Sequence, residues 1–338
     1  MAHELNIENG QASMMYVGEV PWHGLGTRLE KAPKTAAEAI QAARLDWEVG
    51  LKRVYACDGD AFHEFPDRKA VVRLDKWGTE ECVPFGLVSN DYLILQNRKA
   101  FSFFDPIIAT GKVEYHTAGA LGHGERVWVL AKVEGDIVVK GCDRIEKYLL
   151  LSNGHDGRTA LQVRFTPVRV VCANTLSVAI QGKDDLVKIY HVRDMWRRLD
   201  SAQEIVKRIL GFYDGLQSQF EKFASIAMDT ARLTAYHEAV FPTPKRKANQ
   251  SEPAYENAVA IVRGLRQSSL RLFEEGKGNE KTKVRGSLWA AYNGITELVD
   301  HHMNYRDRWQ RLDSLWFGEG ERTKQRAFDE AALIVTTA

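Results

Sequence analysis

The chain has 338 residues, of which 44% are hydrophobic and 27% charged, values that are typical of a globular protein with a sizeable core. No apolar run approaches the roughly 20 residues of a membrane-spanning helix, and the N-terminus lacks the pattern of a secretory signal, so we expect no membrane partner. The formal net charge of +1 excludes a uniformly basic protein, yet residues 140–198 carry 11 Lys and Arg against 6 Asp and Glu, which indicates an anionic partner.

The first 46 residues are predicted to form an N-terminal arm that ends in a short helix. The proline and glycines of VPWHGLG (20–26) disfavour a regular helix, while its tryptophan and leucine can anchor the arm to a domain. Residues 35–45 are expected to be helical, because Thr35 is a good N-cap and Glu38 stands at the position of a capping box.

Residues 47–182 are predicted to form an antiparallel, β-rich α+β domain. Turn sequences such as DGD (58–60), EGD (134–136) and GHDG (154–157) separate short segments that are rich in β-branched and aromatic residues. The expected strands are LKRVYAC, KAVVRL, CVPFGLVS, YLILQN, VEYHTAGAL, RVWVLAKV, DIVVKG, KYLLLSN and ALQVRF. A helix over 97–110, interrupted at Pro106, is expected to pack on this sheet, and a further helix is expected to begin at Pro167.

Residues 183–338 are predicted to form a helical domain with basic loops at 241–253 and 274–286. Apolar residues recur at a spacing of three and four from Leu199 to Phe223, which is typical of helix packing within one chain or of an oligomer seam. The fold class that follows is α+β, with helices packed on an antiparallel sheet in the N-terminal half and a helical C-terminal half.

Three arginines in LSNGHDGRTALQVRFTPVRVVCANTL (151–176) have no evident role in a core. Arg158 follows a turn, Arg164 projects from the strand face opposite the apolar residues, and Arg169 would stand at a helix start, where a cation is unfavourable without an anion. That anion could be a local aspartate or a phosphate. The predicted nucleic-acid-binding residues are Lys140, Arg144, Lys147, Arg158, Arg164, Arg169, Lys281, Lys283 and Arg285. Aromatic residues that could stack on bases, or belong to the core, are Tyr148, Phe165, Tyr190 and Trp196.

Two enzymatic alternatives have a weaker basis. His155 and Asp156, with His23 or His116, could bind a metal, although these residue types beside glycine are also common in turns. Glu297, Asp300 and His301 share one side of a predicted helix and could act as acid and base, or form a solvated or inter-domain polar face. The chain contains no phosphate-binding loop, GxSxG, HExxH or dinucleotide-binding motif, so we assign no catalytic residue, metal or cofactor. Its four cysteines are scattered, which is typical of reduced, mostly buried thiols in the cytoplasm.

Five motifs follow one another along the chain: VPWHGLG, TAGALGHGERVWVLAKV, LSNGHDG, FTPVRVVCANTL and WFGEGERTKQRA. Their sequences and their order resemble a family of phage- and plasmid-like proteins of unknown function, domain-of-unknown-function family 932. The resemblance covers nearly the whole chain and implies a bacterial, phage-borne or mobile-element protein, without any established catalytic residue. At the level of the fold, the expected arrangement also resembles Rad-type single-strand annealing proteins and phage recombinases.

We therefore expect a single-stranded nucleic-acid-binding protein of a phage or mobile element, in the cytoplasm of a bacterial host. More specifically, we expect a homo-oligomeric protein that anneals DNA strands during recombination. Annealing requires that phosphate charges be neutralised, and no bond has to be broken. Two alternatives remain open: a host-interaction or anti-defence protein, and an enzyme that processes nucleic acids or nucleotides.

Overall fold

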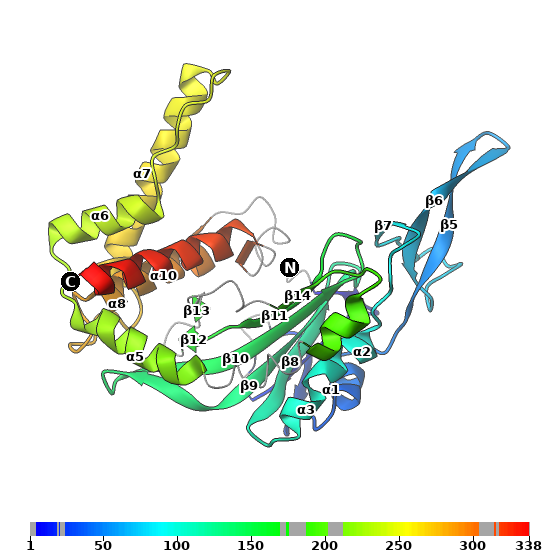
Figure 1. Ribbon diagram of the computed structural model, residues 1–338, viewed down its shortest axis with the longest axis horizontal. Coiled ribbons are helices and arrows are strands. Elements are labelled where there is room, and N and C mark those ends of the chain that lie inside the picture. Colours follow the sequence, from blue (N-terminus) through cyan, green and yellow to red (C-terminus); the bar gives the residue numbers. More distant parts are fainter. Residues whose placement is uncertain are drawn as a thin grey trace. The chain divides into compact units, whose positions relative to one another are not determined.

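The computed structural model describes residues 5–18, 20, 24–169, 174–175, 187–201, 212–303, 314–315 and 318–337 (Figure 1). The chain divides into two compact units, each assembled from separate stretches of sequence. The first unit comprises Met1–Glu134, Tyr148–Phe165 and Lys183–Leu210, and the second comprises Gly135–Lys147, Thr166–Gly182 and Gly211–Ala338. Strands β9 (Arg126–Val139) and β10 (Asp143–Gly154) contribute residues to both units.

The main sheet of the first unit consists mostly of antiparallel pairs. Strand β8 (Val113–Leu121) pairs antiparallel with β9 and with β3 (Met14–Val17), which in turn pairs in parallel with β4 (Thr27–Leu29). Strand β11 (Leu161–Phe165) pairs antiparallel with β10 and with β14 (Val187–Ile189). A separate pair of short strands comprises β1 (Ile7–Glu8) and β2 (Gln11–Ala12). The predicted antiparallel architecture is confirmed, and it includes strands within the segment expected to be an arm.

Short helices cover this sheet beside β8 (Figure 1). They are α1 (Ala36–Ala42), α2 (Asn97–Phe101), the 3-10 helix η1 (Ser102–Phe104) and α3 (Asp105–Ile108). Thr35 caps α1 as predicted, because its hydroxyl accepts a hydrogen bond of 3.3 Å from the backbone of Glu38. The buried Tyr115 of β8 donates its hydroxyl to Phe101 O at 3.1 Å and to Asp105 Oδ1 at 2.9 Å, which anchors the helices to the sheet.

A second, three-stranded antiparallel sheet belongs to the same unit. Its strands are β5 (Val49–Asp58), β6 (Ala61–Arg73) and β7 (Gly86–Ser89). The inner ends of β5 and β6 carry buried valines, whereas the outer half of their hairpin is exposed on both strands and extends beyond the rest of the sheet (Figure 1).

Three local predictions are wrong. Residues 92–97 form no strand, and β9 continues through Gly135 where we expected a turn. The helix expected from Pro167 is replaced by strand β12 (Val168–Arg169), which pairs with β10 at Ile145 and with β13 (Asn174–Thr175). A partner strand within reach therefore overrides the local helix-start signal, because ladder hydrogen bonds and burial depend on tertiary context.

Helices dominate the second unit, as predicted for the C-terminal half. They are α5 (Phe212–Ser225), α6 (Thr230–Val240), α7 (Glu252–Glu275), α8 (Leu288–Glu297), the π-helical turn η2 (Leu298–His302) and α10 (Glu319–Thr337). Their core is aromatic: Phe220 and Phe223 of α5 contact Trp289, Tyr292 and Phe328, with ring centroids 4.7 to 6.4 Å apart.

The predicted apolar stripe from Leu199 to Phe223 is described only in part. Leu199, Leu216, Phe220 and Phe223 are buried, and those in α5 pack against α8 and α10. Ala202, Val206 and Ile209 and the side chain of Tyr213 lie outside the described residues. Within the described part, the stripe of α5 therefore serves helix packing inside its own unit.

Two further expectations can be compared with the described residues. Cys57 is exposed, and Cys82 and Cys142 are partly exposed, so the prediction of mostly buried thiols is wrong for these three; Cys172 lies outside the described residues. None of the described helices combines the length and the apolar character that crossing a bilayer requires.

Candidate nucleic-acid interface

A pocket of about 280 Å³ lies in the first unit, where β7, the turn after β10 and the segment following β14 meet. We call it the Arg158 pocket. Its lining includes two cationic, two phenolic and one imidazole side chain, together with apolar residues of β7. The cationic and aromatic residues of the lining are Arg68, Arg158, Tyr92, Tyr190 and His191.

The turn that carries Arg158 is shaped by Asp156. Its Oδ1 accepts backbone hydrogen bonds from Arg158 at 2.9 Å and Thr159 at 2.7 Å, and its Oδ2 accepts the Thr159 hydroxyl at 2.8 Å. The nearby cation is Arg126, whose Nη2 lies 3.9 Å from Asp156 Oδ2. The local aspartate therefore organises the turn and pairs with Arg126, while the Arg158 side chain stays exposed.

Two glycines let this turn approach strand β7 closely. A Cβ atom on Gly86 would lie 2.2 Å from the carbonyl oxygen of Asp156, which is far inside van der Waals contact. A Cβ atom on Gly157 would lie 2.5 Å from a methyl carbon of Val88, and the φ of +73° at Gly157 also favours glycine. The close packing of turn against strand thus requires both residues, and it sets the position of Arg158.

An aromatic pair forms another part of the pocket lining. The rings of Tyr92 and His191 stack with centroids 5.0 Å apart and an angle of 3° between their planes. His191 Nδ1 lies 3.1 Å from the carbonyl oxygen of Leu93, so this nitrogen carries the proton. Burial lowers the pKa of His191 and raises the pKa of the Tyr92 hydroxyl. Both rings are therefore neutral near pH 7 and offer a flat, uncharged surface.

Tyr190 and Trp196 are the exposed members of the four aromatic candidates, whereas Tyr148 and Phe165 are buried in the core. Tyr190 lines the pocket with half of its surface exposed, at 50%. Lys188 Nζ lies 5.2 Å from the centre of the Tyr190 ring, which is within the range of a cation–π contact. A cation beside an exposed ring is the arrangement that base stacking next to a phosphate requires.

Arg68 was not predicted from the sequence. It projects from β6, where it pairs across the strands with Ser89 of β7, and both residues line the pocket. Within the part of the chain that the structure describes, neither Arg68 nor Arg158 forms an ion pair, and both are exposed. No local signal marks Arg68, because PDRK mixes charges as many solvated strands do. Only the pairing of β6 with β7 brings it to Arg158.

Arg164 has a different environment from Arg158. It shares a strand face with Gln162, as the period of two predicts, and its Nη2 donates to Gln162 Oε1 at 3.2 Å. Gln162 is buried and Arg164 is half-buried, so this face of β11 is covered by protein. Arg164 therefore contributes to the interior of the sheet, whereas Arg158 reaches the surface.

A second basic group lies within the second unit, where the β9–β10 connection meets the loop before α8. Lys281 Nζ donates to Cys142 O at 2.9 Å and lies 3.8 Å from Asp143 Oδ1. A Cβ atom on Gly141 would lie 3.9 Å from Lys283 Nζ. Two predicted segments, more than 130 residues apart in sequence, therefore come together.

Several cations of this second group are neutralised by neighbouring acids. Lys140 Nζ lies 3.5 Å from Glu221, and Arg144 pairs with Asp136 and with Glu146 at 3.6 Å. Lys147 is half-buried, and the side chain of Arg169 lies outside the described residues, although its backbone pairs with Ile145. Lys283 and Arg285 are exposed and, in the described ranges, form no ion pair. These two are the members available to an external anion.

The described histidines considered as metal ligands make contacts inside the protein instead. His155 is fully buried between Trp47 and Phe85, and its Nε2 lies 2.9 Å from Asn97 Oδ1. Burial lowers the pKa of His155 to about 3, so the ring is neutral. His116 contacts Thr117 and Tyr148, whereas His23 lies outside the described residues. Over the residues that are described, no three His, Cys, Asp or Glu side chains are grouped as metal ligands.

The polar face predicted on α8 is buried rather than solvated, because α8 is enclosed on all sides. Glu297 Oε2 accepts a backbone hydrogen bond of 2.9 Å from Lys277. Asp300, in η2, accepts a hydrogen bond of 2.8 Å from the buried ammonium of Lys324. His301 is exposed at the end of this turn. The carboxylates thus hold a loop end and a buried cation in place.

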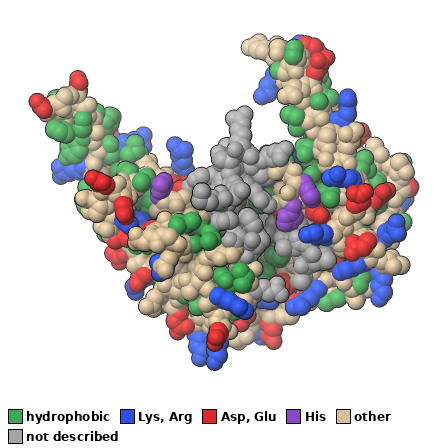
Figure 2. All heavy atoms as spheres, turned by 180° about the vertical axis from the view of Figure 1, so that it is seen from behind, with side chains coloured by type: hydrophobic (Ala, Val, Ile, Leu, Met, Phe, Trp, Pro, Cys, Tyr) green, Lys and Arg blue, Asp and Glu red, His purple; other side chains and the backbone are tan. Residues whose placement is uncertain are grey.

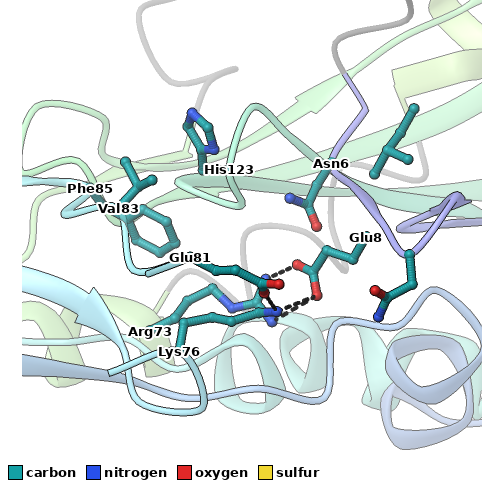
Figure 3. A pocket seen from close by; sticks show the side chains of 10 residues that line it. Asn6, Glu8, Arg73, Lys76, Glu81, Val83, Phe85 and His123 are labelled. Atoms are coloured by element: carbon teal, nitrogen blue, oxygen red, sulfur yellow. Dashed lines mark hydrogen bonds and ion pairs between the residues drawn. The ribbon is translucent and has the colours of Figure 1, made fainter. Parts of the chain in front are cut away.

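Another pocket, of about 330 Å³, lies in the first unit and balances its own charges (Figure 3). Arg73 is buried and pairs with Glu8 and with Asp75, the latter at 2.6 Å. Lys76 pairs with Glu81 and lies 3.6 Å from Glu8. With each cation matched by carboxylates, this pocket attracts anions less than the Arg158 pocket, whose arginines have no acidic partner among the described residues.

Comparison with known proteins gives one match. No curated protein and no solved structure matches this chain. The family described as "Domain of unknown function (DUF932)" matches residues 84–316, which is more than half of the chain. The matched region includes Arg158, Tyr190 and His191 of the pocket, whereas Arg68 precedes it. The chain therefore belongs to the DUF932 family.

Proposed function

We propose that this protein binds single-stranded nucleic acid and that the Arg158 pocket receives one nucleotide of the strand. The observation that carries the proposal is the combination, among the described residues, of two arginines without acidic partners and a half-exposed tyrosine in one pocket. Guanidinium groups bind phosphate oxygens through paired donors, and an exposed phenol ring can stack on any base.

The size and polarity of the pocket favour a single strand over a duplex. At about 280 Å³, it is near the lower limit of small-molecule pockets and suits one nucleotide rather than a helix. A base can reach Tyr190 or the neutral Tyr92–His191 pair only when it is unstacked from its neighbours. Bases of a single strand are free to do so, whereas a duplex must first be opened.

The wider proposal is DNA annealing, in a phage or mobile element and in the cytoplasm of a bacterial host. Annealing requires that phosphate repulsion be reduced while base edges remain accessible, and no bond is broken. Lys283 and Arg285 of the second unit would provide a further contact to the backbone. Such a role needs neither a metal nor a nucleotide cofactor.

The test measures binding of fluorescent single- and double-stranded oligonucleotides by anisotropy over a salt series. We expect Arg68→Ala and Arg158→Ala each to weaken single-strand binding for every sequence. Each should also reduce the slope of log affinity against log salt by roughly 0.7, because one fewer counterion is released. Arg28→Ala is the matched control, since Arg28 is exposed on β4 of the same unit and does not line the pocket.

A second set of variants separates base stacking from phosphate contact. Tyr190→Phe should retain affinity, whereas Tyr190→Ser should weaken binding about tenfold with the salt slope unchanged, because stacking contributes about 1–3 kcal/mol per base. On an oligonucleotide without bases, Tyr190→Ser and the wild type should bind equally. If the arginine variants bind with the wild-type salt slope, or if duplex is preferred, the proposal is wrong.

A further inference from the structure

The outer half of the β5–β6 hairpin, residues 54–67, exposes large aromatic side chains. Tyr55, Phe62 and Phe65 are 44%, 69% and 50% exposed, and hydrophobic side chains gather on this projecting hairpin in Figure 2. Tyr55 pairs with Glu64 and Cys57 with Phe62, so Tyr55 and Phe62 share one face of the hairpin. Exposed aromatic side chains on a projecting element are typical of an interaction surface.

The charge of the same segment disfavours nucleic acid as its partner. Residues 54–67 contain four carboxylates and no lysine or arginine. Among the described residues, Glu64 pairs with Arg53 at 3.7 Å, and no such pair involves Asp58, Asp60 or Asp67. A surface that combines aromatic rings with acids attracts a partner that combines apolar and basic groups.

The second unit presents a surface of that chemistry on α7 and the segment that precedes it. The segment 241–251 contains Lys245, Arg246 and Lys247 and no Asp or Glu. Among the described residues, Arg246 pairs with Glu252, whereas no ion pair involves Lys245 or Lys247. From Glu252 to Ser268, no residue of α7 is buried, Ile261 is 57% exposed, and the helix extends beyond the others of its unit (Figure 1). Arg266 holds the preceding segment along the helix, because its Nε and Nη2 donate to Phe241 O at 2.9 and 2.7 Å.

We propose that the β5–β6 hairpin of one copy docks on the α7 surface of a second copy. The carboxylates of the hairpin would face the basic segment that precedes α7, which carries Lys245, Arg246 and Lys247 and no acid. The aromatic rings would cover the half-exposed apolar residues of α7. Because the two surfaces differ, the contact is head-to-tail, and repetition of it produces a ring or a filament. This inference stands independently of nucleic-acid binding.

The test is a charge-swap experiment followed by light scattering and sedimentation velocity at micromolar concentration. Wild-type protein should self-associate, and increasing salt should weaken the association. The hairpin variant Asp58→Lys/Asp60→Lys and the basic-segment variant Lys245→Glu/Lys247→Glu should each weaken association by at least about tenfold, since like charges then face each other. Mixing the two variants should restore association, because each hairpin then meets an oppositely charged segment of the other variant.

A further variant tests the contribution of the aromatic side chains. Phe62→Ser should weaken association about tenfold without lowering the melting temperature, because Phe62 is exposed and supports no core. A monomeric wild type at all concentrations would overturn the proposal, as would a mixture of the swap variants that stays monomeric. Loss of association in the hairpin variant alone would also overturn it, since the partner surface would then lie elsewhere or on a different protein.

Discussion

Replacement of Gly86 by alanine tests how the Arg158 pocket is built. The new Cβ atom would lie 2.2 Å from Asp156 O, whereas real Cβ contacts stay above 3.0 Å, so turn and strand must separate by about 0.8 Å. Overpacking of this kind costs about 1–3 kcal/mol. Because Asp156 holds the backbone of Arg158, the same displacement should also weaken single-strand binding.

Gly264→Ala is a control variant for which we expect the opposite change in stability. Gly264 lies in the middle of α7, and the space that a Cβ atom would occupy there has no neighbouring atom within 4 Å, so alanine should stabilise the helix by roughly 0.5–1 kcal/mol. Urea unfolding followed by tryptophan fluorescence compares both variants with the wild type. Unchanged or increased stability of Gly86→Ala, or intact binding despite lower stability, would refute this account of how Arg158 is positioned.

Two further predictions concern buried ionisable groups. Burial lowers the pKa of His155 to about 3 and of His237 to about 4, so both stay neutral in the folded protein while the unfolded chain takes up protons below about pH 6.5. The free energy of unfolding should therefore fall by about 2 kcal/mol per histidine between pH 7 and pH 5. His237→Leu should reduce this fall, which urea unfolding at a series of pH values measures. Asp300→Asn should destabilise the second unit by about 3 kcal/mol, because it removes the carboxylate that pairs with the buried Lys324. The double variant Asp300→Asn/Lys324→Met should recover part of that stability in thermal melts. Equal melting temperatures of the single and double variants would contradict this prediction.

Period and turn chemistry predicted much of the fold, because these signals are local. The Thr35 cap, the GHDG turn and the helical pattern after 252 depend on neighbours within one or two turns of chain, and the structure confirms all three. Strand β12 depends instead on β10, a partner that no local pattern reveals. The same limit applies to the candidate site: Arg158 was identified from its turn, whereas Arg68 joins it only through the pairing of β6 with β7.

The sequence pattern also did not predict that strand β11 and helix α8 are buried on both of their faces. Gln162 and Arg164 alternate with apolar residues as on a half-exposed strand, yet Gln162 is buried. Asn293, Thr296 and Glu297 form a polar stripe typical of a solvated helix, but all three residues are buried. Asn293 and Thr296 donate to backbone carbonyls of α8 itself, and Glu297 accepts from the backbone of Lys277. Polar residues of this kind are identified as internal only when the segments that cover them, which are distant in sequence, are known.

The interleaving of the two units has a consequence for how the chain can be divided. Because Gly135–Lys147 and Thr166–Gly182 belong to one unit and Tyr148–Phe165 to the other, no single cleavage of the polypeptide releases either unit intact. Strand β10 pairs with β12 at Ile145 in one unit and with β11 at Leu149 in the other, so a single strand carries one ladder of each unit. We expect amide hydrogen exchange along this strand to report a shared opening event, in which fraying at one end propagates to the other.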